Sequence, residues 1–185
     1  LHEGNESPMW PGMLPSVDPE PICIRPLQAG DAGWIIHRHG TVIAPEFGWN
    51  MEFEALCADI LSQFIRQYQP AYEHSWIATQ TETVVGSLFL VRESETVARL
   101  RLLYIEPCAR GMGLATRLLQ KAIGFARDVG YREVILFTTN SNIAARRIYE
   151  KLGFLLVKEE AFPFAGTCPV GETWCLAVGE EANVR

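Results

Sequence analysis

One stretch of the chain, Leu100 to Leu119, constrains the fold more than any other. It reads LRLLYIEPCARGMGLATRLL: an apolar run stops at Pro107, a loop carries Gly111 and Gly113, and an amphipathic pattern begins at Leu114. This order predicts a strand, a glycine loop and a helix. The first turn of a helix has N–H groups without partners and a partial positive charge, and glycine lets an anion approach them closely. The stretch therefore predicts an anion-binding junction.

Two other phosphate-binding motifs do not fit this loop. A P-loop requires a Gly-Lys pair, and the chain contains none. A dinucleotide fingerprint requires Gly or Ala where Thr116 stands, and a second half-domain for which the roughly seventy residues that follow are too few. A tight turn without a ligand remains an alternative, because Gly-x-Gly before a helix is often only a turn.

The loop from Arg110 to Ala115 (R-x-x-G-x-A) resembles the acyl-CoA pyrophosphate loop of the GNAT superfamily of N-acetyltransferases. A second motif lies downstream. There the apolar segment Glu133 to Thr139 precedes Asn142, Ala145 and Tyr149 in the order and spacing of that superfamily, and a Gly-Phe pair follows. Because two separate motifs agree, the resemblance is specific.

The resemblance covers residues 22–178 and implies an α/β (α+β) fold: a mixed central sheet of about seven strands, splayed between the fourth and fifth and flanked by helices. We expect a Pro-rich irregular arm or linker over residues 1–21, a GNAT domain over 22–180 and a C-terminal tail over 181–185. Within the domain, the pattern predicts strands over 22–27, 75–79, 83–91, 97–106, 133–139, 154–158 and 172–178. It predicts helices over 32–40, 52–68 and 114–129, and a last helix that follows Asn142 and ends at Gly153. Residues 41–50 are predicted to be irregular.

Composition narrows the class of protein. The chain has 185 residues, of which 48% are apolar and 21% charged, enough for one globular domain with a full core. A net charge of −6 without a basic run argues against a nucleic-acid partner. The five cysteines are scattered without a C-x-x-C pair, which predicts a cytoplasmic protein without a metal site. No apolar run approaches the ~20 residues that span a bilayer, so we expect no membrane partner.

The resemblance also implies acetyl-CoA as the acyl donor. The strand before the loop usually carries a bulge in this superfamily, which would turn backbone groups of Leu103, Tyr104 and Ile105 toward the pantetheine arm. Asn142 is interpreted as a helix N-cap, a CoA contact or both. The loop would hold the pyrophosphate mainly through main-chain donors, and its residues are Arg110, Gly111, Met112, Gly113, Leu114 and Ala115.

Tyr149 stands where the superfamily places a catalytic tyrosine that also contacts CoA. A phenol has an ordinary pKa near 10, so at neutral pH it is protonated and can give its proton to the departing thiolate. The alternative is a core tyrosine, since Tyr149 shares a helix face with Ala145 and Leu152. No general base is evident. Glu106, Glu159 and Glu160 are candidates that the sequence leaves unassigned.

The acceptor side is less defined. In most GNAT folds the first helical region lines the acceptor pocket, which makes His37, Arg38 and His39 candidate substrate residues. A structural histidine is an equally good interpretation, and two histidines two positions apart do not suit a metal pair. Arg38 and Arg101 are suited to hold a carboxylate. Arg101 is the more interesting of the two because a charge within an apolar strand should face a cleft, although a salt bridge would also explain it.

The leading hypothesis is an N-acetyltransferase that moves an acetyl group from acetyl-CoA to a primary amine of a small molecule, such as an amino acid or a related metabolite, by direct attack. Acetylation of a peptide or protein amine is one alternative. A non-catalytic acyl-CoA-binding module is another, because segments 33–40 and 46–49 resemble the GNAT domain fused to MarR-type regulators in some bacterial proteins. Tyr149 favours the enzyme, since a sensor needs no proton donor. A homodimer is compatible with the sequence.

Overall fold

The computed structural model describes residues 21–179, so nearly all of the predicted Pro-rich arm and the whole predicted tail lie outside the described residues. The elements in chain order are β1 (Cys23–Arg25), α1 (Asp31–Arg38), the π-helix η1 (His39–Ile43), α2 (Ala44–Phe47), α3 (Glu52–Gln67), β2 (His74–Gln80), β3 (Thr83–Arg92), β4 (Val97–Ile105), the 3₁₀ turn η2 (Pro107–Ala109), α4 (Leu114–Val129), β5 (Glu133–Thr139), α5 (Ile143–Lys151), β6 (Leu155–Ala161) and β7 (Val170–Ala177).

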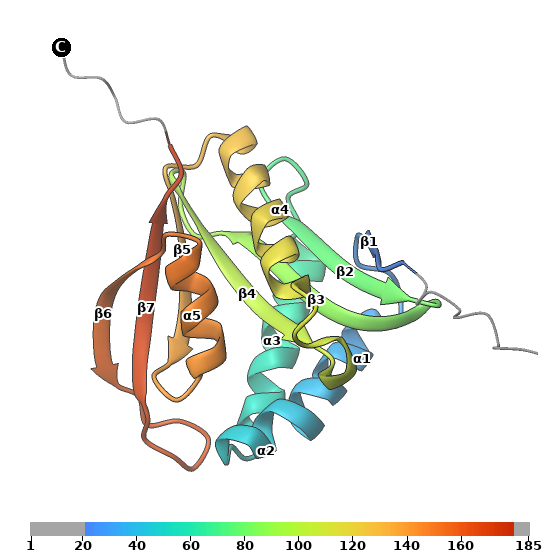
Figure 1. Ribbon diagram of the computed structural model, residues 1–185, viewed down its shortest axis with the longest axis vertical. Helices are drawn as coiled ribbons and strands as arrows, with labels where there is room; N and C mark the ends of the chain where they lie inside the picture. Colours follow the sequence, from blue (N-terminus) through green and yellow to red (C-terminus); the bar gives the residue numbers. More distant parts are fainter. Residues whose placement is uncertain (1–20, 180–185) are drawn as a thin grey trace, which may run out of the picture.

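These strands form one seven-stranded mixed sheet in the order β1-β2-β3-β4-β5-β7-β6. Neighbours are antiparallel except β4 and β5, which run parallel. The long helix α4 and the shorter α5 lie on one face of the sheet, and α1, α2 and α3 lie on the other (Figure 1). The predicted sheet, its flanking helices and the order of its elements are confirmed.

The parallel pair separates along its length. β4 and β5 are in register only over Val97–Arg99 and Glu133–Ile135. Beyond these residues the two strands diverge, which opens a V in the middle of the sheet (Figure 1). The predicted splay between the fourth and fifth strands is therefore confirmed. Its consequence is that residues 100–105 of β4 have no strand partner on the β5 side.

A bulge interrupts β4 inside the V. Pairing with β3 shifts between Ser87 and Phe89, and Leu102 takes a left-handed backbone conformation with φ +51°. The buried Ser87 hydroxyl donates a hydrogen bond of 2.9 Å to the Leu102 carbonyl, which fixes the bulge. Extra residues of this kind re-aim backbone and side-chain groups, and they are frequent beside active sites.

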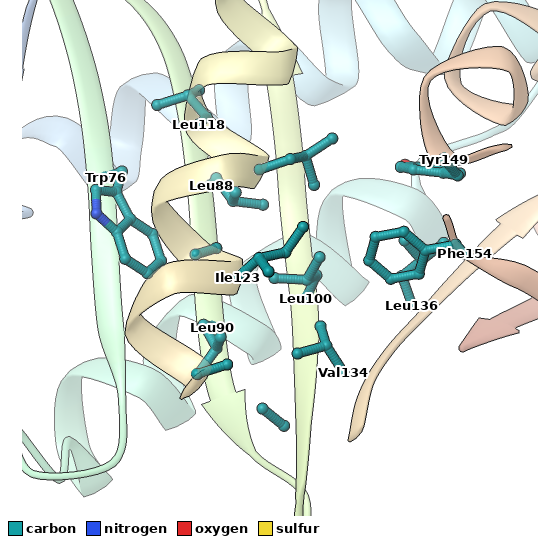
Figure 2. Close-up of a cluster of buried hydrophobic side chains, with 14 of the residues drawn as sticks. Trp76, Leu88, Leu90, Leu100, Leu118, Ile123, Val134, Leu136, Tyr149 and Phe154 are labelled. Atoms are coloured by element: carbon teal, nitrogen blue, oxygen red, sulfur yellow. The ribbon is translucent and has the colours of Figure 1, made fainter. Parts of the chain in front are cut away.

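The sheet packs on two cores. Apolar residues of α4 recur with helical spacing and cover one face, where Leu118 and Ile123 meet Leu88, Leu90 and Leu100 (Figure 2). α1 and α3 cover the other face through a smaller cluster whose buried members are Ile35, Leu61, Phe64, Ile77 and Phe89. With both faces covered, the V is enclosed by helices.

One segment differs from the prediction. Residues 41–50 were expected to be irregular, but the helical path of α1 continues through η1 and α2 to Phe47. The Ala44 N–H donates to the His39 carbonyl, the longer spacing of a π-turn. Pro45 occupies the first turn of α2, where an absent N–H costs nothing. Gly48, with φ +70°, ends the helix.

Candidate active site

A cavity of about 680 Å³ occupies the V between β4 and β5. Residues on both faces of the sheet line it. The cavity therefore connects the face covered by α4 and α5 with the face covered by α3. The residues on the first side include Ala109, Arg110, Gly111, Gly113, Leu114, Ala115, Thr116, Leu119, Asn142, Ala145, Ile148 and Tyr149. Those toward α2, α3 and the loop between β6 and β7 include His39, Phe47, Trp49, Phe53, Leu56, Ile60, Arg101, Phe137, Phe162 and Phe164.

The glycine loop forms the mouth on the α4 side. Gly111 and Gly113 have φ of +76° and +74°, a conformation that favours glycine, and the space where their Cβ atoms would lie is empty. Gly113 is the N-cap of α4, and no side chain caps the helix. The first-turn N–H groups of this sixteen-residue helix are thus directed at an open cradle, a typical anion site. Met112 is exposed and is not part of the lining.

The bulged part of β4 forms one wall. Leu103, Tyr104 and Ile105 all line the cavity. The Tyr104 ring is buried against Trp34 and His39, with ring centroids 5.7 and 5.4 Å away. Its buried hydroxyl lies close to the side chains of Arg38 and Glu106.

Tyr149 lies deep in the cavity, on the inner side of α5. It is only 6% exposed and packs on Phe154, with ring centroids 5.9 Å apart (Figure 2). The Trp174 ring lies on it as well, with its centroid 6.2 Å away. Burial raises the pKa of its phenol well above the ordinary value, so the hydroxyl is protonated at neutral pH. Tyr149 is therefore both a core residue and a part of the cavity wall.

Two further residues of the predicted CoA side are placed by specific contacts. The Asn142 side chain caps α5 by accepting from the Ala145 N–H at 3.4 Å, and Asn142 also lines the cavity. Arg110 pairs with Glu46 of α2 at 2.8 Å and donates to the Ile105 carbonyl at 3.2 Å. Arg110 thereby ties the glycine loop to the helices on the other face.

Comparison with known proteins decides the family. Residues 38–154 match the Acetyltransferase (GNAT) family. The chain belongs to the GNAT family. N-acetyltransferase 8B of Homo sapiens is 38% identical over 84 residues, which cover 43% of this chain and 37% of that protein. N-acetylaspartate synthetase of Danio rerio is 34% identical over 103 residues, which cover 55% of this chain and 36% of that protein. The matched part of the GNAT chain spans little more than a third of these relatives.

Solved structures agree on the fold. An acetyltransferase of the GNAT family from Staphylococcus aureus Mu50 superposes with a TM-score of 0.70 at 17% identity, covering 85% of this chain and 99% of that one. A Salmonella typhimurium protein solved with its cofactor acetyl-CoA gives a TM-score of 0.66 at 19% identity, covering 87% and 96% of the two chains. The GNAT fold is therefore shown over most of the chain.

On the α3 side, the cavity of this GNAT domain has an aromatic wall made of Phe47, Trp49, Phe53, Phe137, Phe162 and Phe164, each partly exposed. The rings contact in series: Trp49 to Phe53 at 4.6 Å, Phe53 to Phe164 at 6.3 Å, Phe164 to Phe162 at 5.1 Å and Phe162 to Phe137 at 4.8 Å between centroids. Two hydrogen bonds of 3.0 Å reinforce it, from Asn50 N–H to the Ala165 carbonyl and from Ala165 N–H to the Glu52 carboxylate. The wall therefore forms a continuous aromatic lining at one end of the cavity.

His39 stands between this wall and the bulge. Its Nδ1 lies 2.8 Å from the Ile35 carbonyl oxygen, which can only accept, so Nδ1 carries the proton and Nε2 is left as an acceptor. Burial lowers the pKa of the imidazole to about 4, and the ring is neutral at pH 7. His39 lines the cavity, whereas His37 is exposed and lies outside the lining.

The two candidate arginines occupy different environments. Arg38 is outside the lining and pairs with both oxygens of Glu106, at 2.5 and 2.9 Å. Arg101 lines the cavity on the α3 side of β4, and within the described part of the chain its guanidinium has no ion pair. The structure thus brings His39 and Arg101 to the cavity and leaves His37 and Arg38 beside it.

The aromatic wall is the part that sequence analysis missed. Residues 47–49 fall in the segment predicted to be irregular, and residues 162–164 lie between two predicted strands. Their richness in aromatic residues was the available signal, but nothing in the sequence pairs the loops. Across residues 21–179, no three His, Cys, Asp or Glu side chains gather as a metal-ligand group, and no helix is long and apolar enough to cross a bilayer.

Proposed function

We propose that this chain is an N-acetyltransferase that transfers the acetyl group of acetyl-CoA to the primary amine of a small molecule by direct attack. The observation that carries the proposal is the cavity that passes through the splayed sheet, with an anion cradle at one mouth and an apolar pocket at the other. Such a passage lets two different substrates meet end to end.

The residues present fit acetyl-CoA. Its pyrophosphate needs several N–H donors and no obstructing side chain, and the cradle of Gly111, Gly113 and the first turn of α4 provides both. The free edge of β4 around the bulge offers backbone groups to an extended arm beside it. The solved Salmonella typhimurium protein of the same fold, which holds acetyl-CoA, supports this assignment.

Acetyl-CoA supplies a thioester, whose carbonyl carbon gains a bond to the amine nitrogen as its bond to sulfur breaks. Tyr149 would give its hydroxyl proton to the sulfur. Burial keeps the phenol protonated at neutral pH and also makes it a weaker acid, so the proton would move as negative charge develops on the sulfur. N–H groups at the splay would stabilise charge on the carbonyl oxygen. The amine loses one proton to solvent or to a base, which balances the reaction.

Direct attack is favoured by what lines the cavity. None of its described lining residues is a cysteine, so the strongest side-chain nucleophile for a covalent acetyl intermediate is missing there. The candidate bases are also constrained. Arg38 holds both Glu106 oxygens, and Glu159 and Glu160 lie on the exposed strand β6, away from the lining.

The continuous aromatic lining on the α3 side suits the apolar part of a small acceptor, which favours a small molecule over a polypeptide. The names of the relatives do not decide between a small acceptor and a polypeptide. N-acetylaspartate synthetase of Danio rerio matches this chain, and so does N-alpha-acetyltransferase 30 of Schizosaccharomyces pombe, at 30% identity over 99 residues. Peptide acetylation therefore remains the second candidate.

A panel assay tests the proposal. The purified chain is incubated with acetyl-CoA and each of the common amino acids, simple amines and short peptides, while free thiol and acetylated product are measured. We expect amine-dependent thiol release with at least one small amine. Acetyl-CoA binding without transfer to any amine would identify a binding module instead, and transfer to peptides alone would support the second candidate. The homodimer stays a prediction that sedimentation of the purified chain tests.

A further inference from the structure

The cavity contains an arginine that forms no ion pair among the described residues. Arg101 is partly buried on the α3 side of β4, beside Ile60 of α3. The nearby acids are already engaged: Glu93 binds Arg99 through two hydrogen bonds of 2.6 and 2.7 Å, and the Glu73 carboxylate accepts from the backbone N–H groups of Gln69 and Arg92 at 2.9 and 3.1 Å. A half-buried cation without a direct ion pair is costly, so this position suits an incoming anion.

The surroundings make the cation more unusual. Burial and the like charge of Arg99 lower the pKa of Arg101, and the opposing charge of Glu93 raises it by less, so the net direction is down. Arginine remains charged at any physiological pH all the same. A planar guanidinium in an apolar cavity binds a carboxylate in a two-pronged geometry, and the contact excludes water.

The aromatic wall lies along the same cavity. Phe53, Leu56 and Ile60 all line it and follow one stripe of α3, with Phe53 in the wall and Ile60 beside Arg101. Seven residues of helix separate the two ends of this stripe by about 10 Å. This span matches a small molecule that has an anionic group at one end and a bulky apolar group at the other.

We propose that the acceptor is an α-amino acid, or a close analogue, that places its carboxylate on Arg101 and a large apolar side chain against the aromatic wall. This inference rests on the proposed function and adds the class of acceptor to it. The amine then lies between the two anchors, on the side of the cavity that holds His39, whose Nε2 accepts a hydrogen bond. Two anchors fix the direction of the amine, which single-anchor amines cannot do.

Three acceptors separate the two anchors: phenylalanine has both groups, phenethylamine lacks the carboxylate, and alanine lacks the ring. We expect kcat/KM to be about tenfold or more higher for phenylalanine than for either of the others. Arg101→Gln should lower the ratio of phenylalanine to phenethylamine by about tenfold, mostly through KM, and Arg101→Lys should lower it less.

Arg66→Gln is the control. It removes an exposed arginine of α3 that lies outside the lining, and it should leave the ratio as in the parent. Acetyl-CoA binding by calorimetry and a thermal melt establish that each variant is folded. Equal kcat/KM for the three acceptors in the parent chain would overturn the inference without any variant, as would an unchanged ratio in folded Arg101→Gln. If no amine of the wider panel is acetylated, the proposed function itself fails.

Discussion

Arg38 and Glu106 join α1 to the end of β4 through two hydrogen bonds, 2.5 Å from Nε to Oε1 and 2.9 Å from Nη2 to Oε2. The side chains are 26% and 14% exposed, so the pair is largely sheltered from water. The next residue, Pro107, begins the turn that leads to the glycine loop. This pair fixes the loop against the helices of the opposite face, and it engages the Arg38 guanidinium and both Glu106 oxygens in a structural contact.

Glu106→Gln should therefore reduce stability and leave the pH dependence of turnover as in the parent. Removing one partner of a sheltered pair leaves the other charge uncompensated, so we expect a loss of about 1–3 kcal/mol in the free energy of unfolding, measured with urea. Glu93→Gln is the control, because Glu93 forms a similar pair with Arg99 but is 40% exposed. Its loss should stay below about 1 kcal/mol. Equal losses would contradict the structural role of the Arg38 pair.

Gly113→Val should abolish most acetyl-CoA binding. The residue has φ +74° at the start of α4, and a side chain there would project into the empty cradle. Gly130→Val is matched to it: Gly130 ends the same helix with φ +92°, and the space for its Cβ is also empty. Both variants should lose similar stability through backbone strain, but calorimetry should find weakened CoA binding only for Gly113→Val. Equal CoA affinities of the two folded variants would remove the glycine cradle from the site.

His39 should make the fold acid-sensitive. Its pKa is about 4 in the folded chain and near 6.5 when unfolded, so between these values the unfolded chain binds a proton that the folded chain does not. Stability then falls as the pH drops from about 6.5 toward 4, by roughly 3 kcal/mol from this group. His39→Gln should show a correspondingly shallower fall in urea unfolding over this pH range. Parallel pH profiles of the free energy of unfolding for parent and variant would contradict this prediction. They would mean that the folded chain protonates the imidazole as readily as the unfolded chain does.

Much of the fold was predictable because its signals are local. The pattern from Leu114 and the glycine at 130 marked α4 correctly, and β5 has the predicted bounds from Glu133 to Thr139. The splay between β4 and β5 was predicted from the resemblance that the two motifs carry, because no local pattern of residues encodes it. The same two motifs also allowed the glycine loop to be assigned to the cavity.

The acceptor end was not predictable because its contacts are distant in the chain. Ala165 bonds the Glu52 carboxylate from 113 positions away, and Arg38 reaches Glu106 across 68. Only the folded sheet brings these segments together. For the same reason the sequence could suggest that Arg101 faces a cleft, but it could not show that Glu93 is taken by Arg99.

Tyr149→Phe separates proton donation from packing. The variant keeps the ring between Phe154 and Trp174 and removes only the hydroxyl, so the thermal melt and acetyl-CoA affinity should hardly change. A general acid contributes about 10² to 10⁴ in rate, and we expect a loss of that size in kcat. The measurement needs saturating acetyl-CoA and a chemical step that limits turnover. A kcat within about twofold of the parent would assign the proton to water or to another group.

Direct transfer through the splayed sheet is the central claim, and a single-turnover experiment measures it. Excess chain is mixed with acetyl-CoA, with or without an amine that the panel assay identifies, and quenched samples are analysed by mass spectrometry for CoA, acetylated amine and acetylated protein. The account predicts that CoA and acetylated amine form together at one rate, only when the amine is present, with no acetyl group on the protein. Acetylated protein that forms without the amine and then passes its acetyl group on would contradict it.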